Sequence, residues 1–357
     1  MVLDPHDPAA LARCERALRA GQLLGLPTET VYGLAADACN AQAVAQIFSA
    51  KGRPADHPLI VHVADLDGGL SGARYFSRDI PDFAMALMQA FWPGPLTLIL
   101  PRQAGVAAQA AGGQDSVGVR CPAHPVAQAL LRALRQSAGG QVVWGLAAPS
   151  ANRFGRVSPT TAAHVHTEMN AGLAPEAPQA LLVLDGGPCG VGIESTIVDC
   201  TRGVPVLLRP GAVGMAALAQ ACGQRVWTPQ ELAAGAPAPR ASGTLAAHYA
   251  PQARVRLWPL APLQAALQPS ARLAHQGAGR IGVYMRSRPA LDQAPDAAHW
   301  LLRAMPPDAA RTAQELFAVL RAFDDAGVAQ IWIEAVPDSE DWAGVADRLQ
   351  RASAAAT

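Results

Sequence analysis

Short apolar runs that end at proline or at polar residues alternate with amphipathic segments over most of this 357-residue chain. Residues 23–26, 59–63 and 116–120 are rich in leucine, valine or isoleucine, which favours buried strands. Residues 9–20 and 82–91 repeat apolar side chains every three or four positions, as an amphipathic helix does. This alternation predicts an α/β fold with a mixed sheet.

The composition changes at residues 233–243, which are mostly alanine, proline and glycine and predict a linker. Beyond it, residues 254–258, 280–284 and 330–334 favour strands, and an amphipathic helix precedes the last of them. This βαβ-like pattern predicts a second, smaller, Rossmann-like α/β domain. We expect a first domain over residues 1–212, a linker or lid over 213–252 and a C-terminal domain over 253–357.

Charge and cysteine content exclude several classes of protein. The chain has 28 Lys+Arg against 28 Asp+Glu, which argues against a strongly basic nucleic-acid binder but leaves room for a local basic cleft. Its 6 cysteines form no CxxC pair, so we expect reduced thiols and no zinc site. We see no signal peptide and no membrane-spanning stretch, and we expect a cytoplasmic protein without membrane contact.

Phosphate-binding motifs of the common kinds are missing from the sequence. There is no GxxxxGK[ST] loop. Residues 277–282 match GxGxxG, but the predicted strand follows this match, whereas a dinucleotide site needs a strand before it. We interpret it as a loop that enters a strand. His164 and His166 are two positions apart on a predicted helix, do not share a face, and are expected on the surface rather than on a metal.

Lys51 is the only lysine in the chain, and it lies in the segment Ser49–Pro58. A lysine offers a compact charge suited to a phosphate oxygen, whereas arginine offers a planar fork. We expect it in an exposed turn just after a helix that Asn40 caps and that extends through Ala50.

Other cations and hydroxyls occupy similar positions at the ends of predicted strands and helices. Each alone is typical of a cap or turn, but together they suit a cleft for a polyanion, whose chemistry rests on positioning and charge. No nucleophilic triad stands out. The set comprises Lys51, Arg53, Arg120, Arg209, Thr28, Thr30, Ser150, Asn152, Ser158, Ser195 and Thr196.

Seven sequence blocks together resemble the YrdC-like threonylcarbamoyl-AMP synthases, in family order, over roughly residues 8 to 212. The continuation through His248-Tyr249-Ala250-Pro251 into a further α/β domain resembles the longer, two-domain form of that family. The blocks are Pro27-Thr28-Glu29-Thr30-Val31-Tyr32-Gly33-Leu34, Lys51-Gly52-Arg53-Pro54, Phe91-Trp92-Pro93-Gly94-Pro95-Leu96-Thr97, Val119-Arg120-Cys121-Pro122, Pro149-Ser150-Ala151-Asn152, Glu194-Ser195-Thr196-Ile197-Val198-Asp199 and Leu208-Arg209-Pro210-Gly211.

The resemblance implies a nucleotidyltransferase that forms threonylcarbamoyl-AMP and pyrophosphate from L-threonine, bicarbonate and ATP, with Mg²⁺ travelling with the ATP. A separate transfer complex would use the product to modify tRNA next to the anticodon. The implied catalytic domain is a twisted mixed α/β sheet with a positive cavity, over which the linker folds. Contact with RNA, including double-stranded RNA, is a further family expectation.

Carried over by position, the family pattern implies two groups of binding residues. Threonine would lie near Thr30, His62, Arg120, Ala148 and Ser195. ATP would contact Lys51, Arg53, His57, Ser116, Ser150, Asn152, Ser158, Arg209, His248 and Tyr249. We expect Lys51 and Arg53 to act on the triphosphate and its leaving group. No general base stands out; Glu29 is near the site, but capping the turn would explain it equally well.

This sequence departs from the family pattern at two places. His57 stands where the family often has asparagine, and it titrates near neutral pH. Residues 241–247 lack the lysine, tyrosine and arginine that some members carry in the lid, which leaves His248 and Tyr249 as the candidates there.

Two alternatives remain from the sequence. Carbamoyl-transferring hydrogenase-maturation proteins contain a YrdC-like module, but they also carry an acylphosphatase-like segment and CxxC zinc motifs that this chain lacks. An RNA-binding module without catalysis would hold tRNA or double-stranded RNA in the same cleft; the balanced charge disfavours it, and local arginines leave it open.

Overall fold

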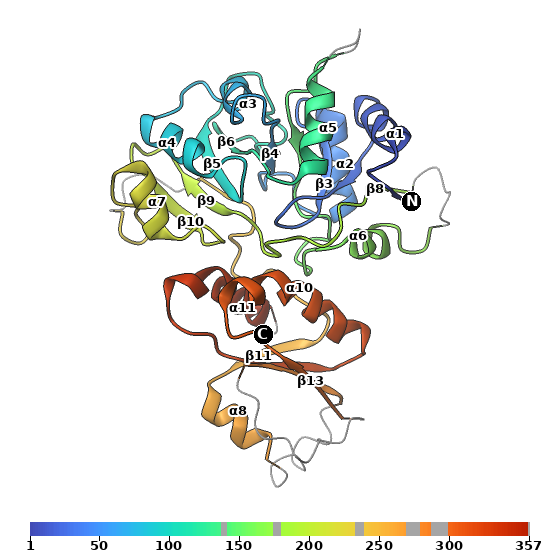
Figure 1. Cartoon of the computed structure of the whole chain (residues 1–357), viewed down its shortest axis with the longest axis vertical. Coiled ribbons are helices and arrows are strands. Elements are labelled where there is room, and N and C mark those ends of the chain that lie inside the picture. Colours follow the sequence, from blue (N-terminus) through green and yellow to red (C-terminus); the bar gives the residue numbers. More distant parts are fainter. Residues whose placement is uncertain (137–140, 174–179, 233–238, 269–278, 287–298, 356–357) are drawn as a thin grey trace. The chain divides into compact units, whose positions relative to one another are not determined.

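The computed structural model describes residues 1–136, 141–173, 180–232, 239–268, 279–286 and 299–355 (Figure 1). By its contacts the chain divides into two units. The first comprises Met1–Phe154 and Ser158–Thr244, and the second comprises Gly155–Val157 and Leu245–Thr357. Both are α/β, as the sequence predicts. Residues 233–238 of the predicted linker and residues 277–278 of the GxGxxG match lie outside the described residues.

The first unit is built on one mixed ten-stranded sheet with the strand order β1-β8-β2-β3-β7-β4-β6-β5-β9-β10. The sheet combines parallel pairs such as β4–β6 and β5–β9 with antiparallel pairs such as β2–β3 and β5–β6. The strands are β1 (Val2–Leu3), β2 (Leu24–Leu26), β3 (Gly33–Asp37), β4 (Ile60–His62), β5 (Leu96–Pro101), β6 (Ser116–Arg120), β7 (Leu146–Ala147), β8 (Leu182–Leu184), β9 (Thr196–Asp199) and β10 (Val206–Arg209).

Helices bury their apolar sides against this sheet. Side chains such as Val44, Ile47 and Leu87 are fully buried among the strand residues of the main core. The helices of the first unit are α1 (Pro8–Arg19), α2 (Ala41–Lys51), α3 (Leu70–Phe76), α4 (Asp82–Phe91), α5 (Pro125–Arg135), α6 (Ala162–Met169) and α7 (Met215–Cys222).

Local signals at both ends set the extent of α2, the helix that carries the only lysine. The side chain of Asn40 accepts hydrogen bonds from the backbone N–H groups of Gln42 and Ala43, as predicted for an N-cap. Gly52 ends the helix with a φ of 62°, a left-handed conformation that glycine adopts without strain. Lys51 is therefore the last helical residue rather than a turn residue.

The second unit is a parallel four-stranded sheet with the order β11-β14-β12-β13, as in Rossmann-like folds. Figure 1 shows helices α10 and α11 on one face of this sheet and α8 on the other. The elements are β11 (Arg254–Trp258), α8 (Leu260–Ala266), β12 (Ile281–Met285), β13 (Trp300–Ala304), α10 (Ala309–Asp325), β14 (Gln330–Glu334), the 3₁₀ helix η2 (Glu340–Trp342) and α11 (Ala343–Ala354).

Several local predictions need correction. The sequence alone predicts a polar turn over residues 28–34, but Gly33 and Leu34 belong to strand β3, because they pair with Leu26 and Gly25 in an antiparallel hairpin. Ser158-Pro159-Thr160 is a typical sequence for a helix start and predicts the cap of the next helix there. The cap of α6 is instead Thr161, whose hydroxyl accepts from the N–H of His164. Strand β13 was not predicted. Among the described residues, no helix is long and apolar enough to cross a membrane.

Candidate active site

Lys51 is buried, which contradicts the expectation of an exposed turn. Only 3% of its surface is accessible, and its ammonium donates hydrogen bonds to the backbone carbonyls of Ser150 and Asn152. Burial, and then the charge of Arg53, lower the pKa of Lys51 to about 7. This lysine can therefore change its charge near neutral pH when an anion approaches.

Arg53 lies two residues after Lys51, just beyond the end of α2, and is also buried. Its Nη2 donates to the carbonyl of Pro58 at 2.9 Å and to the hydroxyl of Ser242 at 3.4 Å. The guanidinium lies 5.8 Å from the ring of Phe154, which also packs edge-on against His57. Partial burial, and then the charge of Arg53, lower the pKa of His57, so this histidine is neutral at pH 7.

Arg209, at the end of β10, is 2% exposed and approaches the same segment of the chain as Arg53. Its Nη1 donates to the carbonyl of Ser242 at 2.8 Å, while Nε and Nη2 donate to the carbonyl of Ser195. Nη2 also lies 3.2 Å from the Ser195 hydroxyl. The two oxygens of Ser242 thus occupy donors of two buried arginines, as oxygens of a phosphate could do.

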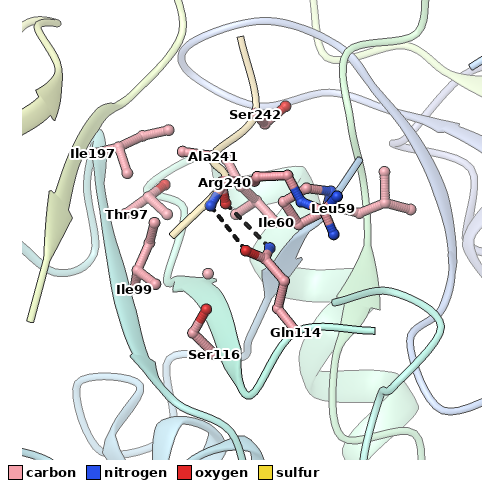
Figure 2. Close-up of a pocket in the computed structure, with 12 residues that line it drawn as sticks. Leu59, Ile60, Thr97, Ile99, Gln114, Ser116, Ile197, Arg240, Ala241 and Ser242 are labelled. Atoms are coloured by element: carbon pink, nitrogen blue, oxygen red, sulfur yellow. Dashed lines mark hydrogen bonds between the residues drawn. The ribbon is translucent and has the colours of Figure 1, made fainter. Parts of the chain in front are cut away.

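An open pocket lies beside Ser242 and holds about 280 Å³ of empty space, part of it open to solvent (Figure 2). The side chain of Gln114 holds Arg240 at its edge by two backbone hydrogen bonds, 2.8 Å from the Arg240 N–H and 3.2 Å to its carbonyl. Apolar walls with a few hydroxyls suit a flat heterocycle such as a nucleobase. The lining residues are Pro58, Leu59, Ile60, Thr97, Ile99, Gln114, Ser116, Gly118, Ile197, Arg240, Ala241 and Ser242.

The remaining residues expected at ATP divide between the two units. Ser116 lines the pocket, whereas the backbone carbonyls of Ser150 and Asn152 accept hydrogen bonds from Lys51. Ser158 is fully buried and its hydroxyl donates to the carboxylate of Glu194. His248 and Tyr249 belong to the second unit.

In the second unit, His248 and Tyr249 take part in an aromatic cluster. Their rings meet edge-on at 4.1 Å, and the Tyr249 ring stacks on Phe317. The guanidinium of Arg348 lies 5.4 Å from the Tyr249 ring centre. Both residues therefore make packing contacts within the second unit.

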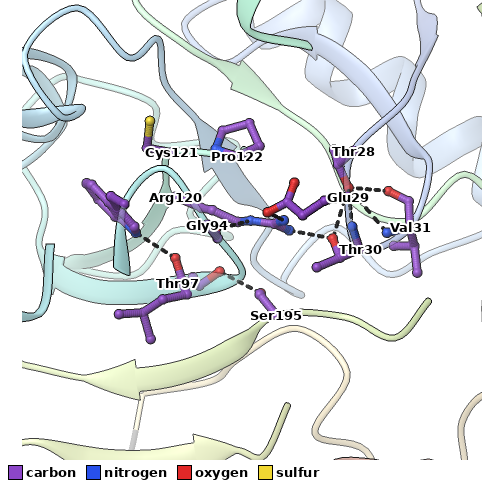
Figure 3. Close-up of polar contacts among 12 residues, drawn as sticks. Thr28, Glu29, Thr30, Val31, Gly94, Thr97, Arg120, Cys121, Pro122 and Ser195 are labelled. Carbon is purple, nitrogen blue, oxygen red and sulfur yellow. Dashed lines mark hydrogen bonds and ion pairs between the residues drawn. The ribbon is translucent and has the colours of Figure 1, made fainter. Parts of the chain in front are cut away.

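Arg120, at the end of β6, is the centre of the residues expected at threonine (Figure 3). Its Nη1 donates to the Thr30 hydroxyl at 2.7 Å, its Nη2 to the Glu29 carboxylate at 2.6 Å, and its Nε to the carbonyl of Gly94 at 3.2 Å. Burial alone would raise the pKa of Glu29, but the adjacent charge of Arg120 holds it below its usual value. The pair is therefore ionised.

His62 lies next to Arg120, because parallel pairing of β4 with β6 places the two residues in register. Burial, and then the charge of Arg120, lower the pKa of His62 to about 3, so its ring is neutral at pH 7. Ala148 follows β7 directly and donates its N–H to the carbonyl of Ile60. These placements bring Thr30, His62, Arg120 and Ala148 onto neighbouring strands or strand ends.

Ser195 connects this group to the arginines at Ser242. Its hydroxyl lies 2.7 Å from that of Thr97 and 3.2 Å from Nη2 of Arg209. The backbone carbonyl of Gly94 accepts from Arg120, and the carbonyl of the next residue, Pro95, accepts from the N–H of Thr196. Arg120, expected at threonine, and Arg209, expected at ATP, are therefore connected through the short paired segments Gly94–Pro95 and Ser195–Thr196.

Comparison with known proteins decides the family. A family model described as "Telomere recombination" (Sua5, YciO and YrdC) matches residues 16–211, and one described as "Threonylcarbamoyl-AMP synthase, C-terminal domain" matches residues 213–354. The chain belongs to the threonylcarbamoyl-AMP synthase family. This confirms the family predicted from the motifs.

Relatives match both units of this threonylcarbamoyl-AMP synthase family member. The threonylcarbamoyl-AMP synthase of Bacillus subtilis is 35% identical over 352 residues, 98% of this chain and 94% of the relative. That of Pyrococcus abyssi is 40% identical over 238 residues, 67% of this chain and 64% of the relative. The crystal structure of P. abyssi Sua5 complexed with L-threonine superposes with a TM-score of 0.83 at 32% identity, covering 100% and 98% of the two chains.

Four residues of this family member's site were not predicted from the sequence. Thr97 lies within one of the family-like sequence blocks but was not predicted as a site residue, and neither were Gln114, Arg240 and Ser242. The signal for Thr97 was its place in a strand directly after a Pro-Gly-Pro break. The other three gave none, because their role depends on a contact between residues more than one hundred positions apart.

Proposed function

We propose that this enzyme joins L-threonine, bicarbonate and ATP to form threonylcarbamoyl-AMP and pyrophosphate. The observation that carries the proposal is that Ser195 contacts the buried Arg209 and is linked to the buried Arg120 through the paired backbone of Pro95 and Thr196. We assign Arg120 to the amino-acid side and Arg209 to the phosphate side. An enzyme that joins an amino-acid derivative to a nucleotide needs one site for the carboxylate and one for the phosphates, close enough for the two substrates to react. The named relatives favour this function over an RNA-binding module without catalysis.

In the proposed reaction, the threonine nitrogen bonds to the carbon of bicarbonate, a C–O bond of bicarbonate breaks, and water and a proton leave to give a carbamate. A carbamate oxygen then attacks the α-phosphorus of ATP, and the bond from that phosphorus to pyrophosphate breaks. Arg120 holds the threonine carboxylate by its remaining N–H groups, and Ser195 and Thr97 offer hydroxyls to the substrate side chain.

Lys51, Arg53 and Arg209 form the proposed triphosphate site. On ATP binding, phosphate oxygens replace the oxygens of Ser242 at Arg53 and Arg209. The charge of the triphosphate also favours protonation of Lys51, which compensates the charge that develops on departing pyrophosphate. The adenine then occupies the pocket beside Ser242.

Mg²⁺ enters this proposal as part of the MgATP substrate. The described residues contain no group of three or more His, Cys, Asp or Glu side chains that could hold a metal ion. The phosphate oxygens of ATP are therefore the proposed ligands, together with water.

The product is proposed to serve a tRNA threonylcarbamoyl-transfer complex in the cytoplasm. Direct contact with tRNA or double-stranded RNA stays a separate prediction from the family. A filter-binding titration over a range of salt concentrations tests it, since binding through phosphates weakens steeply with salt.

The deciding experiment measures pyrophosphate release by the full chain with MgATP and bicarbonate, with and without L-threonine, beside Lys51→Ala. We expect release that requires both threonine and bicarbonate and is lost in the variant. Release without threonine would identify another acceptor. No release under any condition, by protein that is folded and binds ATP, would refute the proposed activity.

A further inference from the structure

Glu29 has one carboxylate oxygen in use and one without a partner. Oε1 accepts from Arg120 at 2.6 Å, whereas Oε2 is buried and accepts no hydrogen bond of normal geometry among the described residues. The backbone N–H groups of Glu29 and Ala123 lie near enough to the carboxylate to help lower its pKa. The Glu29 side chain is 15% exposed and that of Arg120 is 4% exposed. A buried carboxylate oxygen without a donor costs free energy, so its retention at a site points to a donor supplied by a ligand.

The free donors of Arg120 lie beside this free acceptor. A guanidinium carries five N–H groups, and three hydrogen bonds of Arg120 are made, to Gly94, Thr30 and Glu29. The remaining N–H groups can hold a carboxylate. An α-amino acid carries its carboxylate and its ammonium group on one carbon, so the Arg120–Glu29 pair is complementary to both (Figure 3).

We propose that Oε2 of Glu29 binds the α-nitrogen of the amino-acid substrate, first as ammonium and then as carbamate N–H. The inference deepens the proposed function and rests on it. Of the three ammonium protons, one leaves in the water formed from bicarbonate and one passes to solvent. The third stays on the carbamate nitrogen and keeps its hydrogen bond to Oε2. The nitrogen therefore remains in place while the newly formed carbamate group turns toward the nucleotide.

Glu29 acts in this proposal as an acceptor, not as a base that removes the proton. Burial raises the pKa of Glu29, but the charge and hydrogen bond of Arg120, together with the backbone N–H groups of Glu29 and Ala123, hold it below its usual value, so the carboxylate stays ionised through neutral pH. An ionised carboxylate accepts hydrogen bonds but donates none. It can therefore bind an ammonium group, but it cannot bind a group that only accepts, such as a second carboxylate.

Glu29→Gln tests the proposal with two ligands. L-Threonine carries the α-nitrogen, whereas 3-hydroxybutanoate of matching configuration keeps the carboxylate and the β-hydroxyl but has only hydrogen on its α-carbon. Affinities are measured by calorimetry, or by competition where binding is weak. We expect threonine to bind at least about 10-fold more weakly to the variant, with 3-hydroxybutanoate and ATP unchanged, because the amide loses the charge and presents N–H groups to the ammonium.

Thr30→Val is the matched control for an indirect effect through Arg120. It removes the hydrogen bond from Nη1 of Arg120 and leaves Oε2 of Glu29 in place. The affinities for threonine and for 3-hydroxybutanoate should therefore fall by the same factor. Equal weakening of both ligands in Glu29→Gln would overturn the proposal and make Glu29 a positioning residue for Arg120. Unchanged threonine affinity would also overturn it.

Glu29→Asp serves if Glu29→Gln does not fold, as judged by thermal unfolding. The shorter carboxylate keeps the charge but withdraws its oxygens, and we expect a selective loss of threonine affinity there too. These binding measurements are independent of turnover. Threonine binding that depends on Glu29, without pyrophosphate release, would sustain the inference and refute the proposed function.

Discussion

His62 and Arg120 lie opposite each other on the parallel strands β4 and β6, and the arginine helps to keep the histidine uncharged. Both are at most 3% exposed. Burial and the neighbouring guanidinium lower the pKa of His62 to about 3, far below the value of 6.5 that it regains on unfolding. Below pH 6.5 the unfolded chain therefore binds a proton that the folded chain does not, and stability falls as the pH falls toward 3.

His62→Gln should remove this pH dependence. Between pH 7 and pH 5, protonation of the unfolded histidine costs the wild type about 2 kcal/mol of unfolding free energy. Urea denaturation at both pH values measures the loss, which we expect to be smaller in the variant by that amount. Equal losses in the two proteins would show that His62 titrates in the folded state.

ATP binding at pH 8 should take up a proton at Lys51. The folded chain holds this lysine with a pKa of about 7, so it is mostly neutral at pH 8, and phosphate oxygens would favour its charged form. Calorimetry in two buffers of different ionisation enthalpy gives the number of protons taken up. Lys51→Met, which keeps the apolar stem, should take up fewer, and identical uptake by both proteins would exclude Lys51 from the triphosphate site.

Lys51→Ala should also lower stability, which an exposed residue would not do. The carbonyls of Ser150 and Asn152 lose their ammonium donor, at a cost of roughly 1–3 kcal/mol. Denaturant unfolding at pH 7 checks this. The loss of turnover in the variant has to be measured below its own unfolding transition, with thermal unfolding as the control.

Gln114→Ala should release the segment that contains Arg240. The Gln114 side chain accepts from the Arg240 N–H at 2.8 Å and donates to its carbonyl at 3.2 Å. We expect the Arg240 amide to exchange its hydrogen at least about 10-fold faster in the variant, as for a segment that opens locally. Hydrogen exchange followed by NMR checks this, with Gln103→Ala as a surface control, and unchanged exchange would show that other contacts hold the segment.

Gly211→Ala should destabilise the first unit. A Cβ at this position would lie 2.5 Å from the backbone nitrogen of Thr196 and 2.9 Å from the carbonyl of Glu194, so β9 or the turn must shift. We expect a loss of about 1–3 kcal/mol in unfolding free energy. Gly190→Ala, where a Cβ meets nothing within 4 Å, should change stability by less than about 0.5 kcal/mol.

The sequence was sufficient for what depends on local patterns. Helix α4 and strands β6, β11 and β14 have the predicted bounds because their periodicity and their flanking prolines or polar residues are local signals. Strand β3 could not be predicted, since its glycine, leucine and alanine residues have little preference for strands and form one only because β2 and β7 pair with them. Its hydrogen bonds come from elsewhere in the chain.

The same distinction applies to the site. The motifs identified Arg120 and Arg209 as candidate anion-binding residues, but the burial of Lys51 depends on carbonyls some hundred positions away. The unpaired oxygen of Glu29 and the approach of Ser242 to two arginines are likewise set by packing between distant segments. A single sequence carries no local signal for them.

The register between β4 and β6 has a consequence for how the enzyme gains its activity during folding. The residues expected at threonine come from separate segments: Thr30, His62, Arg120 and Ser195. These segments approach one another only when strands that are distant in the sequence have paired. Such pairing is slow, because long loops must close before any contact compensates the lost entropy. A refolding chain should therefore acquire native-like helices well before it can bind threonine, and recovery of threonine binding would report completion of the sheet.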